Sequence, residues 1–459
     1  METILQDLHA IVGDAGLLLG ADVAQRPAMS LGKGSCEARA IVRPATPEEL
    51  SQVMALCHRN DQPVVPWGGL TGLVNGATAQ PHEIAISLER MTAIEEFDEQ
   101  AGILVVQAGA PMQKVQEAAA DKGWLFALDL GARGTATIGG NIATNAGGNS
   151  VLRYGMMRQQ VLGLEAVLAD GTLLSSMNQM LKNNAGYDLK HLFIGTEGTL
   201  GIVTRAVLRL HPLPRSRNTA FVGVESFAQL SILLRELSAS LSGQLSSFEV
   251  MWGNFYRLMT EQTGKHPVIM PTDLPYYVLI EATGNSADED AQRFEQILGE
   301  ALESGTLLDA VIAQSETQAD NLWAMRDDIE TLVQAMSPLI AFDVSLPIKA
   351  MEQYVQEVET TLLSRWPEAR LLVFGHMGDG NLHLIITTGA DTDANRHAVE
   401  TLVYEKLVPL AGSVSAEHGI GLEKRQFLPC SRSDVEIALM KTLKQALDPK
   451  NLLNPGKVI

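Results

Sequence analysis

Apolar segments and helical patterns alternate along the chain from Ala40 onward. The apolar AIVRP precedes a helical pattern in PEELSQVMALCHRN, and a second apolar segment, PVVPWGG, follows and runs into glycines. The alternation continues through EIAISL, GILVVQAG, the helical PMQKVQEAAADKG, VLGLEAVLADGTLL and LGIVTRAVLRL. Residues 1–30 have the pattern of short helices. The first half therefore predicts a mixed structure with enough strands for more than one sheet.

Prolines and polar residues interrupt this pattern at residues 211–219, where we predict a domain boundary. Beyond it, strands at YYVLIEAT, LLDAVIAQ, IAFDVSLP and RLLVFGH alternate with helical segments, including one helix predicted over about 317–336. This order predicts an α+β domain in which helices cover one face of one sheet. A last helix is predicted to end at Asp448, before Pro449.

Size and charge narrow the class of protein. The 459 residues exceed the roughly 250–300 that one hydrophobic core supports, so two or three domains are expected. With 34 Lys and Arg against 54 Asp and Glu, the net charge of −20 repels polyanions and argues against a nucleic-acid partner. A long uncharged run, residues 134–152, is rich in Gly, Thr and Asn and too polar to span a membrane.

The cysteines and the first residues bear on the compartment. Cys36, Cys57 and Cys430 are widely spaced and form no CxxC pair, so neither a disulfide framework nor a thiolate metal site is supported. The opening METILQDLHAIVGDAGLLLG lacks a basic region before an apolar stretch, so we expect neither a signal nor a transit peptide. The corresponding expectations are a chain that begins at Met1 and a reducing, cytoplasmic location.

Two glycine-rich loops, WGGLTG and IGGNIATNAGG, are the first candidates for ligand contact. Glycine lets the backbone approach a ligand closely, and successive N–H groups can bind a diphosphate without a cationic side chain. The chain has no GxxxxGK[ST] motif and no GxGxxG motif after a strand, which excludes an ATP or GTP P-loop and a Rossmann NAD site. A dinucleotide would therefore bind in another fold.

Two histidines flank a glycine-rich turn in FGHMGDGNLHLII. The glycines favour a strand, a tight turn and a second strand, which brings His376 and His383 to one side as candidate metal ligands. In SAEHGIG, Glu417 and His418 are adjacent, so one could bind the metal while the other faces the substrate. Two imidazoles and one carboxylate are the donors of a catalytic zinc site and also accept Mn²⁺ or Fe²⁺.

Arg326 lies on a predicted helix in NLWAMRDDIE. Its planar guanidinium could bind a substrate carboxylate through two hydrogen bonds. The alternative is an ion pair with Asp327, Asp328 or Glu330, which the local sequence favours.

Six motifs together carry a resemblance to a known family: PWGGLTGLVNG, ATIGGNIATNAGGNSVLRYG, AGYDLKHLFIGTEGTLGIVT, GHMGDGNLH, SAEHGIGLEKR and LDPKNLLNPGK. The chain resembles the FAD-linked D-2-hydroxyacid dehydrogenases, the group with D-lactate and D-2-hydroxyglutarate dehydrogenases, among the vanillyl-alcohol oxidase type of flavoproteins. The resemblance implies an α+β fold with an N-terminal helical segment (1–35), a two-subdomain FAD-binding domain (36–214), an α+β substrate- and metal-binding cap (215–412) and a C-terminal segment (413–459) that returns to the FAD domain.

The resemblance also implies that the glycine-rich loops bind FAD. Carried over by motif, the implied contacts are Pro66, Trp67, Gly68, Gly69, Leu70, Thr71, Gly72, Leu73, Gly139, Gly140, Asn141, Thr144, Asn145, Gly147, Gly148, Gly198, Gly201, Ile202, Val203 and Asn454. Family members with covalently bound flavin have a His after the first Gly pair, where this chain has Leu70. Non-covalent FAD is therefore expected.

The remaining implied residues belong to the reaction. His376, His383 and Glu417 match the family's metal ligands, His418 its proposed base, Arg326 its carboxylate anchor and Asn381 a supporting substrate-binding residue. The implied reaction oxidises a D-2-hydroxyacid to its 2-oxoacid, with the hydride passing to flavin N5. The implied electron acceptor is not NAD but an electron-transfer flavoprotein or a quinone-linked carrier, and a homodimer is compatible with the sequence.

Three positions depart from the pattern of the members that act on 2-hydroxyglutarate. Those members have a Thr, a Lys and an Asn where this chain has Glu330, Ala341 and Ile385. Losing a cation weakens the second anchor of a dicarboxylate, so D-lactate or another monocarboxylic 2-hydroxyacid is at least as good an expectation.

Three other functions share these sequence features. A non-redox ether-lipid synthase has the same scaffold but a different histidine-rich pattern. A subunit of a larger glycolate oxidase would carry the same motifs and need partner chains. A flavin- or metal-binding module without activity would never have its flavin reduced by a hydroxyacid.

Overall fold

The computed structural model describes residues 3–27, 35–390 and 392–459. The chain divides into two compact units. Unit 1 comprises Met1–Gly148, Gly155–Leu213 and Glu417–Ile459, and unit 2 comprises Asn149–Tyr154 and Pro214–Ala416. The division after Leu213 falls within the interruption at residues 211–219, whereas the domain limits at 36, 215 and 413 stay predictions.

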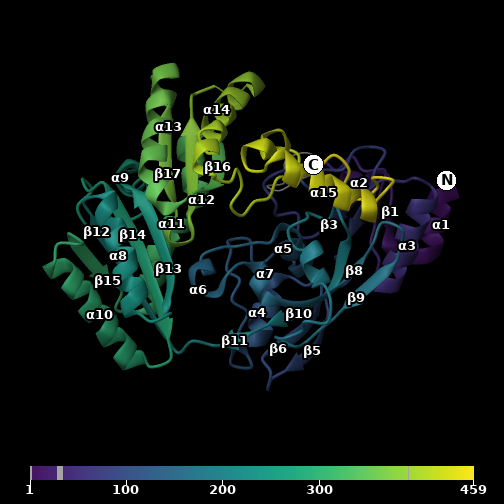
Figure 1. Cartoon of the computed structure of the whole chain (residues 1–459), viewed down its shortest axis with the longest axis horizontal. Coiled ribbons are helices and arrows are strands. Elements are labelled where there is room, and N and C mark those ends of the chain that lie inside the picture. The colour runs from purple at the N-terminus through teal and green to yellow at the C-terminus, as the bar shows by residue number, and fades with distance from the viewer. Residues whose placement is uncertain (1–2, 28–34, 391) are drawn as a thin grey trace. The chain divides into compact units, whose positions relative to one another are not determined.

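Unit 1 contains two main sheets (Figure 1). The first is parallel except for its first strand, in the order β1 (Leu17–Leu18), β2 (Ala40–Val42), β4 (Ile84–Ser87) and β3 (Val64–Trp67). The second is antiparallel, in the order β5 (Ile94–Asp98), β6 (Ile103–Gln107), β10 (Ile202–Arg209), β8 (Val161–Val167) and β9 (Leu173–Ser176). A separate short pair joins β11 (His211–Pro212) to β7 (Trp124–Leu125).

Helices pack against these sheets. Those of unit 1 are α1 (Thr3–Val12), α2 (Ala21–Ala24), α3 (Pro47–Arg59), α4 (Met112–Ala120), α5 (Ile138–Thr144), α7 (Met157–Gln160) and α15 (Asp434–Leu447). The sequence dictates the start of α3, because Thr46 accepts the N–H of Glu49 at 3.1 Å and Pro47 occupies the first helical position. Its apolar side chains, including Leu50, Val53 and Cys57, are then buried in the core.

The C-terminal segment of unit 1 is held to the first sheet. Val64 of β3 donates its N–H to the Leu452 carbonyl at 2.8 Å and forms a bridge with Leu453. The Lys444 ammonium donates to the carbonyl of Thr199 at 2.9 Å, the carbonyl of Leu453 at 2.7 Å and the Asp448 carboxylate at 2.6 Å. These bonds fix the residues after α15 beside β3 and the loop before β10.

Unit 2 is built on one antiparallel sheet of seven strands (Figure 1, teal to green). Its order is β15 (Asp309–Ile312), β12 (Ser216–Val224), β14 (Tyr276–Gly284), β13 (Leu245–Trp252), β17 (Arg370–His376), β18 (Asn381–Thr387) and β16 (Ile340–Ser345). Its helices are α6 (Val151–Tyr154), α8 (Phe227–Ser240), α9 (Gly253–Arg257), α10 (Ala287–Glu303), α11 (Glu316–Asp327), α12 (Ile329–Met336), α13 (Met351–Arg365) and α14 (Asp393–Glu405).

Helices cover both faces of this sheet, so the expectation of one covered face is wrong. Side chains alternate between the faces of a strand. On one face, Phe221 and Leu279 pack in an apolar cluster with residues of α9, α11 and α12. On the other face, Val222 and Val278 are equally buried, and α8 and α10 contact the same strands.

The single helix predicted over 317–336 is also wrong, because the structure has two helices that break at Asp328. Asp328 has ψ 68°, outside the helical range, and its carboxylate accepts the N–H of Thr331 at 3.0 Å and thereby caps α12. The same carboxylate lies 3.0 Å from His266 Nε2. Among the described residues, no helix is long and apolar enough to cross a membrane.

Candidate functional site

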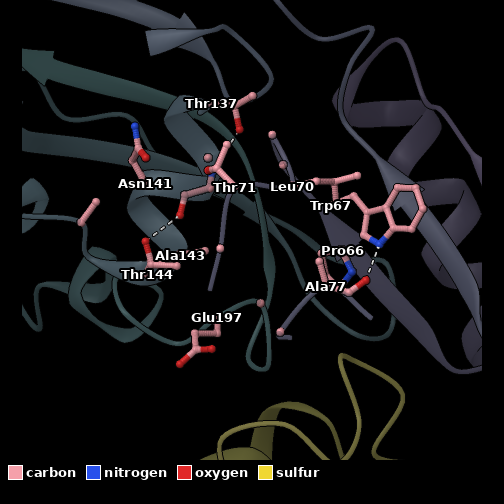
Figure 2. Close-up of a pocket in the computed structure, with 18 of the residues that line it drawn as sticks. Pro66, Trp67, Leu70, Thr71, Ala77, Thr137, Asn141, Ala143, Thr144 and Glu197 are labelled. Carbon is pink, nitrogen blue, oxygen red and sulfur yellow. Dashed lines mark hydrogen bonds between the residues drawn. The ribbon is translucent and has the colours of Figure 1, made fainter. Parts of the chain in front are cut away.

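Unit 1 contains a cavity of about 390 Å³. It is lined by the loop that follows β3, by α5 and the residues after it, by the loop before β10, and by Glu417, His418 and Asn454. Figure 2 shows the side chains of the first three segments around the cavity. Every residue that the sequence assigned to FAD contact lines this cavity except Asn145.

The close approach of two backbones shapes the cavity. A Cβ atom at Gly69 would lie 1.9 Å from the carbonyl oxygen of Thr135, so only glycine fits at this position. Thr137 accepts the N–H of Gly140 at 3.3 Å and caps the start of α5 (Figure 2). Trp67 donates its indole N–H to the Ala77 carbonyl at 2.8 Å, which closes the loop after β3.

The cavity fits a dinucleotide held by backbone groups. Its described lining includes no Lys and no Arg, so a diphosphate would depend on backbone N–H groups. Two buried polar atoms of the lining, Asn141 Nδ2 and Asn454 Oδ1, have no hydrogen-bond partner within the described residues. Buried polar groups are normally paired, so both atoms suit a polar ligand such as FAD.

Asn145 has a structural role instead. It ends α5 in the left-handed conformation, with φ 50°. Its Oδ1 accepts the N–H of Arg158 at 2.9 Å. This bond turns the side chain toward α7, which explains why Asn145 does not line the cavity although it lies inside the motif.

Glu197 is a cavity residue that the sequence analysis missed. Its carboxylate accepts the N–H of Ile420 at 2.7 Å and the N–H of Gly421 at 2.9 Å, and its carbonyl accepts Asn454 Nδ2 at 2.8 Å. Burial raises the pKa of Glu197 although these N–H donors oppose the shift. Glu197 thus anchors the segment that carries Glu417 and His418. These contacts join residues more than 200 positions apart, so no local motif reveals them.

Unit 2 brings both predicted histidines together. His376 ends β17, a turn over Met377–Asp379 follows, and His383 lies on β18, as the glycine-rich turn predicted. The two imidazole rings lie 5.4 Å apart between centroids, at 82° to each other. Both side chains are on the sheet face that α11 and α12 cover.

A buried carboxylate, Glu249 of β13, joins His376 to Arg326. Glu249 Oε1 lies 2.7 Å from His376 Nδ1, and Glu249 Oε2 accepts Arg326 Nε at 3.0 Å. Burial alone would raise the pKa of Glu249, but His376 and Arg326 together lower it to about 2. The carboxylate is therefore charged at neutral pH, and its contact with Nδ1 leaves Nε2 as the nitrogen of His376 that could bind a metal.

Arg326 is buried and ion-paired. Its Nη1 lies 3.1 Å from Asp327 Oδ1, one of the partners expected from the sequence, whereas the partner Glu249 was not foreseen. Its Nη2 lies 3.3 Å from His376 Nε2. The guanidinium also lies 5.1 Å from the ring centroid of Phe374, in cation–π range. Arg326 is therefore fixed beside the imidazole pair.

Asn381 lies on the same sheet face, next to a second buried carboxylate. Its Nδ2 donates to Asp343 Oδ1 at 2.9 Å and to the Val344 carbonyl at 3.0 Å. Its Oδ1 is buried without a hydrogen-bond partner in the described part of the chain. Asp343 Oδ1 also lies 3.9 Å from His383 Nδ1, so each histidine has a carboxylate beside it.

Glu417 and His418 both line the cavity of unit 1. Glu417 Oε1 accepts the N–H of Gly148 at 2.5 Å. A Cβ atom at Gly147 would lie 2.4 Å from the same oxygen, so the glycine pair leaves room for this carboxylate. Because the histidines belong to unit 2, the set of His376, His383 and Glu417 as metal ligands stays a prediction.

Two family models cover most of the chain. Residues 38–176 match the model described as "FAD binding domain". Residues 213–458 match the model described as "FAD linked oxidases, C-terminal domain".

Proteins of similar sequence cover nearly the whole chain. A Rattus norvegicus protein named "D-2-hydroxyglutarate dehydrogenase, mitochondrial" is 39% identical, over 92% of this chain and 78% of that protein. A Xanthomonas citri protein named "D-2-hydroxyglutarate dehydrogenase" is 40% identical, over 91% of this chain and 89% of that protein. A Schizosaccharomyces pombe protein, whose name proposes a mitochondrial D-lactate dehydrogenase, is 36% identical over 100% of this chain and 90% of that protein.

Solved structures show the fold. An alkyldihydroxyacetonephosphate synthase superposes with a TM-score of 0.75 at 18% identity, over 98% of this chain and 84% of that one. A p-cresol methylhydroxylase with substrate bound superposes with a TM-score of 0.78 at 16% identity, over 99% of this chain and 96% of that one. At these identities the likeness concerns the fold alone, and it confirms the predicted α+β architecture of the vanillyl-alcohol oxidase type.

Proposed function

Because the chain belongs to the family of FAD-linked D-2-hydroxyacid dehydrogenases and is an FAD-dependent oxidoreductase, we propose that it oxidises a monocarboxylic D-2-hydroxyacid such as D-lactate with the help of a divalent metal. The observation that carries the proposal is the cluster in unit 2. There an imidazole pair suited to a metal lies beside a buried guanidinium suited to a carboxylate. A 2-hydroxyacid presents a hydroxyl and a carboxylate on neighbouring atoms, which matches this pair of groups.

FAD is assigned to the cavity residues, and the metal is assigned to the two histidines and Glu417. FAD would be held non-covalently in the cavity of unit 1, since Leu70 stands where a flavin-linking His would be and residues 68–78, which line the cavity after β3, include no His, Cys or Tyr. The metal, with zinc as the first choice, would be held by His376, His383 and Glu417. When bound, FAD accepts a hydride at N5, and the metal acidifies a bound alcohol.

The chain's own residues orient the substrate and move its proton. Arg326 would bind the carboxylate, since a guanidinium has five N–H donors and can serve more than one carboxylate. His418, which lines the cavity, would take the hydroxyl proton as general base. Asn381 would support the substrate through its buried amide oxygen.

The choice of a monocarboxylic substrate is supported by the environment of two positions that differ from 2-hydroxyglutarate dehydrogenases. Ile385 belongs to the apolar cluster beneath α11 and α12, and its cross-strand neighbour is Ala341. Neither side chain can pair with a second carboxylate. Glu330, on α12, would repel one.

The electron acceptor and the compartment stay predictions. We expect an electron-transfer flavoprotein or a quinone-linked carrier, because the chain has no nicotinamide fingerprint. The sequence predicts the cytoplasm, whereas most of the similar proteins carry "mitochondrial" in their names.

Turnover with an artificial electron acceptor tests the proposal. Purified, zinc-supplemented protein should form pyruvate from D-lactate and little from L-lactate. Its kcat/KM for D-2-hydroxyglutarate should be no higher than for D-lactate. A strong preference for the dicarboxylate would overturn the substrate assignment, and inactivity with every D-2-hydroxyacid would overturn the proposed reaction.

A further inference from the structure

We propose that Glu249 is a positioning residue that holds the metal ligand His376 and the substrate anchor Arg326 in one fixed arrangement. This inference rests on the proposed function, because it assigns a role to Glu249 only through those two residues. Glu249 lies in SSFEVMW, outside all six motifs of the family resemblance. The assignment therefore comes from the structure.

The two carboxylate oxygens of Glu249 have separate partners. Oε1 lies 2.7 Å from His376 Nδ1. Oε2 accepts Arg326 Nε at 3.0 Å and lies 2.9 Å from Arg326 Nη2. One rigid group thus sets both the ring orientation of His376 and the plane of the guanidinium. A metal-ligating His commonly donates its other ring N–H to a carboxylate in this way.

The sheet leaves Glu249 little freedom. It lies on β13 directly opposite His376 of β17, and Leu279 of β14 is its neighbour on the other side. Its side chain is only 1% exposed, and Arg326 and His376 are 7% exposed. Hydrogen bonds are stronger away from water, whereas a buried charge without partners is costly. Glu249, Arg326 and His376 therefore form one buried hydrogen-bonded cluster, in which the position of each side chain depends on the other two.

The same sheet face offers a matched control at Glu281 of β14. Its carboxylate lies 2.7 Å from Arg217 Nε and accepts the indole N–H of Trp323 at 2.8 Å. The hydrogen bonds of the Glu281 carboxylate thus come from Arg217, Thr219 and Trp323 of α11, and not from the imidazole pair. Replacing it tests the loss of a half-buried, ion-paired carboxylate on the same sheet face without removing a residue of the proposed site.

The experiment compares zinc affinity and substrate KM in the full-length holoprotein and in Glu249→Gln, Glu249→Asp and Glu281→Gln. Glutamine keeps the size of the side chain but offers an amide in place of one carboxylate oxygen. Aspartate keeps the charge but is shorter. We expect both Glu249 variants to bind Zn²⁺ about 10- to 100-fold more weakly. We also expect their KM for D-lactate to rise about tenfold, with unchanged FAD content. Glu281→Gln should match the wild type in all three measurements.

The outcomes separate this inference from the function on which it rests. Wild-type zinc affinity and KM in Glu249→Gln would overturn the positioning role while leaving the proposed function intact. A wild-type chain that binds FAD but no metal would overturn the metal site and the inference together. If Glu249→Gln fails to fold, Glu249→Asp decides: weakened zinc binding at full FAD content supports the role, and unchanged binding refutes it.

Discussion

Ala341 and Ile385 are the side chains on which the proposed choice of substrate mainly rests. The two residues are cross-strand neighbours on β16 and β18. Ile385 is 6% exposed and belongs to the apolar cluster, whereas Ala341 is exposed and has room for a longer side chain. At Ala341 the relatives that act on 2-hydroxyglutarate are expected to have a Lys. The proposed site therefore lacks the cation that would bind the second carboxylate of a dicarboxylic substrate.

Ala341→Lys should raise kcat/KM for D-2-hydroxyglutarate relative to D-lactate by about tenfold or more. A hydrogen bond to a charged group contributes roughly 1.5–3 kcal/mol, and each 1.4 kcal/mol is a factor of about ten. Steady-state kinetics with both substrates measures this ratio. Ala341→Gln is the control for size without charge, and an equal gain in that variant would refute the electrostatic explanation.

Some site residues could be predicted from sequence and others could not. His376 and His383 were recognisable because only six residues, which include a glycine-rich turn, separate them on adjacent strands. Glu249 lies 127 positions from His376, and a lone Glu in an apolar strand has no local signature. Arg326 was recognised as a residue of interest, but its main partner is the same distant carboxylate.

At the scale of elements, Asp328 separates α11, which carries Arg326, from α12. The helical pattern is continuous across this point, so periodicity alone predicted a single helix. Asp328 breaks it because its carboxylate is bound by Thr331 and lies against His266, 62 positions away. Burial would raise the pKa of Asp328, but these hydrogen bonds lower it below the usual value.

Asp328→Ala should lower the unfolding midpoint by about 2–4 °C at pH 7, since losing a helix cap typically costs about 1 kcal/mol, and each kcal/mol lowers the midpoint of a large domain by about 2–4 °C. A carboxyl whose folded pKa is lowered contributes stability that is fully present above its unfolded pKa, about 3.9. That contribution is lost as the pH falls through the folded pKa. The contribution of this carboxyl should therefore be fully present at about pH 5 and shrink below about pH 4. Asp328→Asn can still cap the helix, so its unfolding midpoint should fall less. A difference in midpoint between wild type and Asp328→Ala that grows as the pH falls below about 4 would contradict this account.

At the scale of the whole molecule, the two histidines proposed as metal ligands belong to a different unit from the residues assigned to FAD, whereas the third proposed ligand, Glu417, belongs to unit 1. All cavity-lining residues assigned to FAD belong to unit 1, whereas His376 and His383 belong to unit 2. The sequence predicted the fold class because its glycine-rich motifs are long and contiguous. It did not predict that helices cover both faces of the seven-stranded sheet, since buried positions on alternate sides of a strand look like one apolar run.

His376→Ala should therefore lose bound zinc and turnover but keep FAD. The substitution removes one proposed metal ligand and no residue that lines the cavity. Metal analysis and the flavin absorbance of the purified variant measure the two cofactors independently. His397→Ala, on α14, serves as a control for the loss of an imidazole outside the proposed site. Full turnover in a zinc-free His376→Ala protein would refute the metal requirement.

The most direct test of the central claim is anaerobic mixing of the zinc-replete protein with D-lactate and with L-lactate, followed by the absorbance of oxidised flavin. Oxidation of a D-2-hydroxyacid with hydride transfer to FAD predicts rapid loss of the flavin bands with D-lactate and almost none with the L-enantiomer. Unchanged flavin bands with D-lactate and with every other D-2-hydroxyacid, in protein that contains both FAD and metal, would contradict the account.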